Sequence, residues 1–533
     1  MIGNSGLFNR TDGLRPGRSV FDLSYEVKGT MDMGQLIPIF AQECVPGDTF
    51  KVGNQIVVRF QPLVTPTLHE IKVHTHYYFV PYRILWDEFE QMITGGEDGL
   101  DATPIPKWKP TNVSLHSLWD YFGFPIDFTV PSGSEWDHTF PVDFPRRAYN
   151  FIYNEYYRDQ NLMDEVDWTN EDVLYRLWYK DYFTTALPWQ QRGIAPAIPV
   201  SGTGFAQFTD DMAVKLSFPP NTFLNGQSGE MLWMSDTYGK LMPNLYGRIP
   251  GSPPEIPNTV KPMSIYLGKD DLSNNEVLIN TSGFTVSDLR LAFQVQKWQE
   301  RNARAGVRYT EFLKSHFGTS PSDARLQRPE YIGGTKSPII MSEVLQTSST
   351  DATSPQGTMA GHGMSAAGNF AGSYTADEYG IIIGLMSIMP DTVYQDGIHR
   401  QWLKDTRYDF FFPEFAHLSE QEVRFAEIRY TGTDKDNEVF GFQGRYNEMR
   451  YNPSRIVGYM RSGLSGSLDF WHLARHWDRS SPPELNEEFL LCKPDKRIFA
   501  VLDEPGIIFN VANTVKAIRP LPYTAEPGLI DHF

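Results

Sequence analysis

The chain has 533 residues, 43 glycines, 38 prolines and a net charge of −18. This length suffices for about three or four average domains, although large all-β units can break that rule. The acidic balance argues against a basic nucleic-acid-binding domain and leaves room only for local basic contacts.

The first 20 residues are polar and glycine-rich, and we expect them to form an extended N-terminal arm. Arg10, Arg15 and Arg18 stand there against a single acid, Asp12. Arginines among glycines can neutralise phosphates without reading base sequence, so these three are the candidate DNA contacts. The alternative is a set of solvated charges without a partner.

The start of the chain shows no signal peptide, and no run of 18 apolar residues predicts a spanning helix. We therefore expect synthesis in the cytosol and no membrane insertion. Cys44 and Cys492 lack metal-ligand spacing and indicate a reducing compartment; they could pair only if the fold brings them together.

Residues 21–82 carry β patterns. The stretch 55–60 is rich in strand formers, and in 71–79 apolar residues alternate with Lys72, His74 and His76. Such period-2 alternation is typical of a half-buried strand.

Three segments have helical patterns: 148–161, which is rich in aromatic residues, 170–183 and 286–305. The last is the clearest, because Leu291, Val295 and Trp298 fall at i, i+4 and i+7 and Gly306 suits a helix end. Between the last two, residues 201–281 contain eight prolines and eight glycines without long periodic segments. We interpret 201–281 as a surface insertion, since long loops inside a compact protein are usually functional or disordered.

In the C-terminal half, small polar residues predict an irregular loop over 346–373. Strand patterns return from Tyr379, with buried strands expected at 381–386 and 497–502. Helix–strand alternation is missing, so the fold class is predicted to be mainly β.

A search for chemistry gives no catalytic, cofactor or metal site. His74 and His76 could chelate a metal from one strand face, but no third ligand is evident. His472 and His476 have the helical spacing of a zinc site, yet Leu473 stands where a metalloprotease has its glutamate. We interpret the first pair as polar residues on a solvated or interface face and the second as part of a packed helix.

Two further possibilities stay open at this point. Lys493, Lys496 and Arg497 form a second basic group that could meet nucleic acid. The abundant carboxylates also allow a β-sandwich carbohydrate-active enzyme, which needs only two suitably spaced acids.

Several long strings resemble one family, the major capsid proteins of the microviruses, particularly the gokushovirus branch. They lie between about residues 20 and 500, leaving out the insertion, and include Cys44–Phe50, Tyr78–Trp86, Arg147–Asn150, Arg158–Leu162, Asp181–Trp189, Glu300–Arg304, Arg308–Glu311, Ser315–Gly318, Asp323–Tyr331, Arg407–Phe410, Phe415–Leu418 and Tyr451–Arg455.

The resemblance implies a single eight-stranded antiparallel jelly roll over 21–533, with long loop and helical insertions and no enzymatic activity. It implies a T=1 icosahedral shell around circular single-stranded DNA, with 201–281 forming a protrusion at the threefold axes. Expected partners are other copies of the chain, the genome, an internal scaffolding protein and a DNA pilot protein. We also expect 201–281 to contact a host surface receptor, and the protein to reside in the virion after synthesis in the host bacterial cytoplasm.

Overall fold

The computed structural model describes residues 17–109, 113–126, 140–196, 203–205, 212–215, 264–267, 278–280, 286–345, 359–418 and 421–524. Two compact units divide the chain, one made of 1–192 with 299–533 and the other of 193–298. The predicted insertion, 201–281, falls in the second unit. The described part of that unit includes two short antiparallel pairs, β6 (Thr203–Phe205) with β9 (Leu278–Asn280) and β7 (Met212–Lys215) with β8 (Ser264–Leu267).

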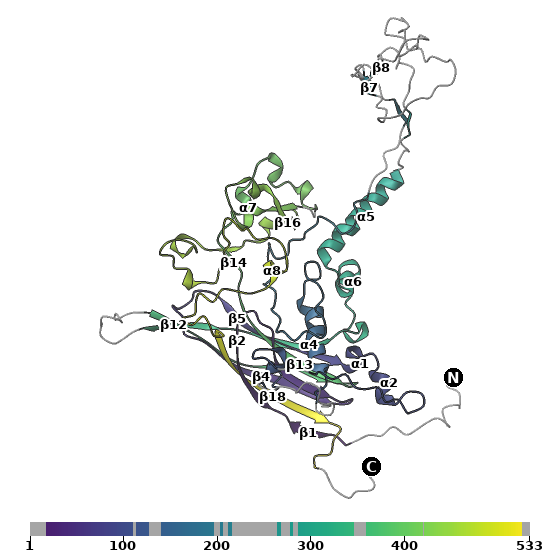
Figure 1. Cartoon of the computed structure of the whole chain (residues 1–533), viewed down its shortest axis with the longest axis vertical. Coiled ribbons are helices and arrows are strands. Elements are labelled where there is room, and N and C mark those ends of the chain that lie inside the picture. The colour runs from purple at the N-terminus through teal and green to yellow at the C-terminus, as the bar shows by residue number, and fades with distance from the viewer. Residues whose placement is uncertain are drawn as a thin grey trace, which may run out of the picture. The chain divides into compact units, whose positions relative to one another are not determined.

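Two antiparallel sheets form the centre of the first unit (Figure 1). The larger sheet contains β1 (Ser19–Asp22), β2 (Tyr25–Met31), β4 (Thr49–Phe60), β11 (Ile340–Leu345), β12 (Met359–Thr375) and β18 (Ile507–Arg519). The smaller sheet has the order β10 (Glu330–Pro338), β5 (Ile71–Pro81), β13 (Gly380–Pro390), β3 (Ile37–Cys44).

The strand order is that of a jelly roll. β1 and β2 pair with successive parts of β18, so together they occupy one strand position. The larger sheet then runs β2-β18-β4-β12 and the smaller β3-β13-β5-β10, which is a pair of Greek keys. The structure confirms the mainly β, antiparallel prediction, and β11 is an edge strand beyond the eight expected.

The space between the sheets is filled by side chains that alternate along the strands. Ile56, Val58 and Phe60 of β4 meet Ile71 and Val73 of β5 in one apolar cluster. A second cluster closes the other end of the sandwich around Phe50, Phe79 and Val515. Burial of this apolar area is the main favourable term for the fold.

Helices cover the outer face of the smaller sheet. They are α1 (Tyr82–Leu85), α2 (Phe89–Thr94), α3 (Leu118–Tyr121) and α4 (Phe144–Ile152), the last continued by a π-helix (Tyr153–Tyr157). Aromatic side chains of α4 pack on β5 and β13. The face of β5 that carries His74 and His76 is covered too, since His74 contacts Tyr179 and His76 contacts Tyr157. The sequence predicted a solvated or interface face for these two histidines. The predicted helix at 148–161 is confirmed in part, since helical structure ends at Tyr157.

The predicted helix at 286–305 is confirmed as α5 (Val286–Ala305), and α6 (Tyr309–Phe317) follows it. The predicted helix at 170–183 is wrong. That segment is extended, because backbone bonds tie Leu174 to Leu36 and Arg176 to both Gly34 and Cys492. These long-range partners are invisible to a local pattern.

Two other local predictions are wrong. The expected loop at 346–373 is instead the long strand β12 from Met359 onward, with residues 346–358 outside the described residues. Its small residues allow close packing: a Cβ on Gly361 would lie 2.3 Å from the Thr65 carbonyl oxygen. The strand expected at 497–502 is a turn, and the last strand is β18.

After β13, residues 391–506 form a lobe with its own apolar cluster. Its elements are α7 (Phe425–Ile428), α8 (Glu487–Leu490), the parallel pair β14 (Val393–Tyr394) with β17 (Ser454–Arg455), and the antiparallel pair β15 (Gln421–Arg424) with β16 (Val439–Gln443). In Figure 1 these elements are drawn in colours from green (α7) to yellow (α8). Tyr394, Phe425 and Phe440 pack there with Tyr182 and Phe183.

Candidate assembly surface

The lobe exposes a dense group of aromatic side chains over 402–412. Trp402 is 72% exposed and Phe410 55% exposed. Tyr408, Phe411 and Phe412 are exposed as well, and these five residues are called the aromatic surface below. Soluble monomers rarely show a large contiguous apolar patch, whereas protein–protein interfaces are enriched in aromatic residues and arginine.

Cations surround the aromatic surface. Lys404 Nζ lies 4.2 Å from the centre of the Phe410 ring, and the Arg407 guanidinium lies 4.8 Å from that of Tyr408. Arg445 lies against the Tyr446 ring, which packs on Phe411. Arginine and aromatic rings are the residues that carry most binding energy at interfaces.

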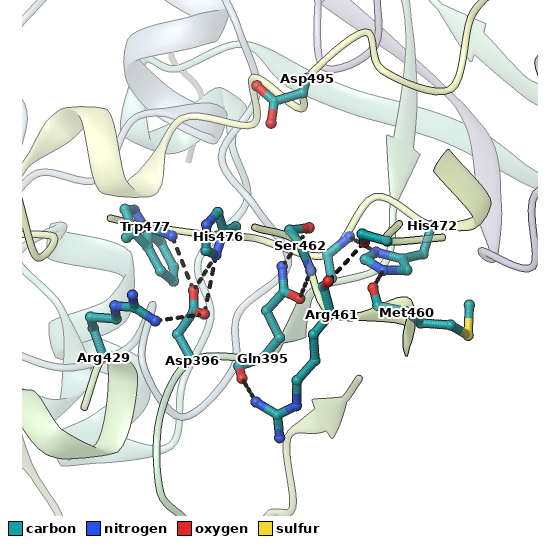
Figure 2. Close-up of polar contacts among 12 residues, drawn as sticks. Gln395, Asp396, Arg429, Met460, Arg461, Ser462, His472, His476, Trp477 and Asp495 are labelled. Carbon is teal, nitrogen blue, oxygen red and sulfur yellow. Dashed lines mark hydrogen bonds and ion pairs between the residues drawn. The ribbon is translucent and has the colours of Figure 1, made fainter. Parts of the chain in front are cut away.

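Asp396 fixes the backbone that precedes the aromatic surface in the chain (Figure 2). Its carboxylate accepts hydrogen bonds from Arg429 Nη1 at 2.9 Å and from the Trp477 backbone N–H at 3.0 Å, and it lies 3.1 Å from His476 Nδ1. The side chain of Asp396 is only 7% exposed. A buried carboxylate with several donors joins chain segments firmly, because losing any donor would leave charge unsatisfied.

Gln395 makes a second connection beside it. Its amide nitrogen donates to Ser462 Oγ, its amide oxygen accepts from the Ser462 backbone N–H, and its own carbonyl accepts from Arg461 Nη1 at 2.6 Å (Figure 2). Two consecutive residues thus join the 429, 461–462 and 476–477 segments, and this fixes the backbone that leads into the aromatic surface.

A buried ion pair fixes the next turn of the chain, the 3-10 helix Arg400–Trp402. Arg400 Nη1 lies 2.8 Å from Glu427 Oε1, and the Tyr182 hydroxyl donates to Glu427 Oε2 at 3.0 Å. Burial raises the pKa of the Glu427 carboxyl, although Arg400 opposes this effect. A cavity of about 690 Å³ borders Arg400, Glu427 and Trp402.

Of the three predicted DNA contacts, the structure describes only Arg18. Arg10 and Arg15 lie outside the described residues. Arg18 is exposed just before β1, and its guanidinium lies beside Gly47, where an added Cβ would be 3.2 Å from Nη2. Contact of these three arginines with DNA stays a prediction.

The second basic group has partners within the chain. Lys496 pairs with Asp32 at 2.9 Å, and Lys493 lies over the Tyr175 ring. Arg497 pairs with Asp495 and donates to backbone carbonyls, including that of Ala474. These contacts give the group a structural role.

The two histidine pairs take part in internal hydrogen bonds. His74 Nε2 lies 2.7 Å from the Tyr179 hydroxyl, and His76 Nδ1 lies 2.7 Å from that of Tyr157. His472 and His476 are not on a helix, which corrects that prediction; His472 contacts the Met460 carbonyl (Figure 2). Among the described residues, no group of three potential ligands could hold a metal.

Burial raises the pKa of both cysteine thiols, Cys44 and Cys492, and neither forms a disulfide. Within the described residues, we find no helix with the length and apolar character needed to cross a membrane.

Viral capsid subunits share these features, a jelly roll and exposed aromatic side chains available for contacts between copies. The family model described as "Capsid protein (F protein)" matches residues 11–529, so the chain belongs to this phage capsid family. It is 34% identical to capsid protein VP1 of Chlamydia phage 1, over 96% of each chain. The same-named proteins of Bdellovibrio phage phiMH2K and Spiroplasma virus 4 are 32% and 30% identical, over at least 97% of each chain.

These findings confirm the resemblance seen in the sequence: the chain is a structural major capsid protein of the microvirus type, assembles with itself into a capsid and is a component of the virion. It has a structural, non-enzymatic role, and nothing supports the carbohydrate-active enzyme. Sequence reasoning missed the aromatic surface, although the run Phe410-Phe411-Phe412 in a polar segment was a usable signal.

Proposed function

We propose that copies of this chain close into a T=1 icosahedral shell around circular single-stranded DNA and that the aromatic surface contacts a neighbouring copy. The single observation behind this contact is the exposure of five aromatic side chains on a lobe whose backbone is fixed by buried charges. A rigid aromatic face loses little conformational entropy when a partner covers it.

Substitution of Trp402 and Phe410 by serine tests the assignment. We expect the double variant to remain folded but to lose assembled particles by at least tenfold, seen by sedimentation and electron microscopy. Tyr408→Phe is the matched control, because it removes one hydroxyl and keeps the apolar area. Normal particle yield from the double variant would rule out the aromatic surface as a subunit contact.

We propose that 201–281 forms the threefold protrusion and contacts a receptor on the host surface. The support is that the segment falls in a compact unit separate from the jelly roll. Particles with this segment shortened should assemble and should adsorb to host cells at least tenfold less. Unchanged adsorption would contradict the receptor role.

We propose that Arg10, Arg15 and Arg18 contact the genome. We also propose that the particle is made in the host cytoplasm and that an internal scaffolding protein and a DNA pilot protein join it there. Support comes from membership of the capsid family and from the exposure of Arg18. Replacing all three arginines by alanine should weaken the salt-dependent retention of DNA in the particle. Retention equal to that of the unmodified chain would remove this assignment.

A further inference from the structure

A cavity of about 550 Å³ in the first unit lies apart from the aromatic surface. Its wall is built from the end of the π-helix and the following loop, from the 180–187 segment, and from the link between α5 and α6. Figure 1 shows α6 in this part of the first unit. The assembly proposal assigns no role to this space.

The charged residues of the wall are mostly cations, although the chain as a whole has a charge of −18. They are Arg158, Lys180, Arg304 and Arg308, against the acids Asp159 and Glu311. Lys180 Nζ pairs with Asp159 at 2.7 Å. A concave wall with excess positive charge focuses the field and attracts anions.

Arg158 has unused donors. Its Nη1 donates to the Met163 carbonyl at 3.1 Å, which is the one hydrogen bond of the Arg158 side chain within the described part of the chain. Its Nε is buried without a partner there. Its Nη2 makes no hydrogen bond with the described residues and is not among the buried atoms, so this nitrogen can meet an acceptor that enters the cavity.

Arg308 lies next to Arg158 and has more partners. Its Nη2 donates to the carbonyls of Asn154 and Arg158, at 3.0 and 2.8 Å, and its Nη1 pairs with Glu311 Oε1 at 3.4 Å. Its Nε is likewise buried, with no acceptor among the described residues. The hydrogen bonds that fix this guanidinium therefore leave its Nε–H without an acceptor among the described residues.

Both arginines lie at the ends of helices, which fixes the backbone at each position. Arg158 directly follows the π-helix, a rare element that is frequent at functional sites. Arg308 precedes α6, and its backbone N–H donates to the Glu311 carboxylate at 3.1 Å. Gly306, with φ of +104°, allows the sharp link from α5. The two side chains are thus positioned before any ligand arrives.

We propose that this cavity binds a phosphate group, either as the free anion or as a phosphodiester in a nucleic-acid backbone. The planar fork of arginine matches the oxygens of phosphate, and charge-assisted hydrogen bonds are the strong ones. The inference does not rest on the shell geometry or on the aromatic surface, so it can fail or succeed separately from them.

Calorimetric titration of the full-length protein tests the site with two probes, inorganic phosphate and an eight-residue oligothymidylate, in chloride buffer. We expect saturable binding that weakens as salt is raised. Arg158→Gln should weaken it roughly ten- to a hundredfold, since a hydrogen bond to a charged group is lost. Arg158→Lys keeps the charge but lacks the fork and should fall in between. Arg450→Gln, which changes an exposed arginine outside the cavity wall, is the control and should bind as the unmodified chain does.

Binding of both probes with loss in Arg158→Gln indicates recognition of the phosphate group itself. Binding of the oligothymidylate alone, again lost in Arg158→Gln, identifies a phosphodiester as the ligand. Thermal unfolding checks that the variants are folded, and if Arg158→Gln is not, Arg158→Lys decides. The proposal would be overturned if neither probe bound, or if the unmodified chain and the folded Arg158 variant bound the probes equally.

Discussion

The jelly roll and the lobe over 391–506 are stabilised in different ways. The jelly roll fills its interior with aliphatic and aromatic side chains from facing strands. The lobe has an apolar cluster too, but it also buries the carboxylates of Asp396 and Glu427 in ion pairs and exposes Trp402 to solvent.

The difference shows how one chain serves both folding and assembly. Apolar packing between two sheets is non-directional and makes a robust platform. Buried ionic networks are directional, so they fix irregular backbone that has no strand partner. The lobe can therefore hold the residues of the aromatic surface at a defined place without burying them in its own core.

Acidification should affect the jelly roll most. Burial lowers the pKa of His74 to about 3 and that of His76 to about 4, and nearby Arg176 acts in the same direction. The unfolded chain takes up these protons below about pH 6.5, so the free energy of unfolding falls as pH drops from there towards 4. The loss is at most about 1.4 kcal/mol per pH unit for each histidine.

Denaturant unfolding of the subunit at pH 7.0, 5.5 and 4.5 measures this loss. The double variant with glutamine at positions 74 and 76 is the control, since it lacks both titrating rings. A pH slope in that variant as steep as in the unmodified chain would show that other groups dominate.

In the lobe, Asp396→Ala should lower the free energy of unfolding by about 3–5 kcal/mol, because Arg429 would keep a buried charge without its partner. Asp396→Asn retains the shape and some hydrogen bonds, so its cost should be smaller. Hydrogen exchange at the Trp477 backbone N–H, which donates to Asp396, would report the local effect. Equal stability of the alanine variant and the unmodified chain would contradict the role of this network.

In the jelly roll, Gly361→Ala should cost about 1–3 kcal/mol, because its Cβ would lie 2.3 Å from a backbone oxygen that cannot move away. Gly368→Ala is the matched control on the same strand, where the added Cβ meets only Gln55 Cγ at 3.4 Å. Thermal unfolding of the two variants should separate them clearly. If both behaved alike, close packing would not explain the small residues of β12.

The smallest effect is expected for Trp402→Ser. Its side chain is 72% exposed, so the free energy of unfolding of the isolated subunit should change by less than about 0.5 kcal/mol. Denaturant titration checks this. A loss above 1 kcal/mol would mean that the aromatic surface supports the lobe itself and not only a contact with another copy.

The elements predicted correctly depend on near neighbours in the chain. Residues 286–305 have a helical period and a stop signal, and 381–386 form an apolar run bounded by polar residues. Both signals are local, so the tertiary structure did not change them. Family membership was likewise visible in the sequence, because its strings are long and specific.

Tertiary structure decided the rest. The glycines and alanines of 359–375 resemble a loop, yet β4 and β11 pair with them and need that close approach. Residues 170–183 have a helical pattern, but Arg176 donates a backbone hydrogen bond to the Gly34 carbonyl and accepts one from the Cys492 N–H, and these bonds hold the segment extended.

By itself, then, the sequence determined the mainly β class, α5 and the capsid family. It could not place Arg158 beside Arg308, 150 residues apart, or show Trp402 exposed and Asp396 buried. Burial and side-chain proximity depend on contacts between distant segments, and those exist only once the chain has folded.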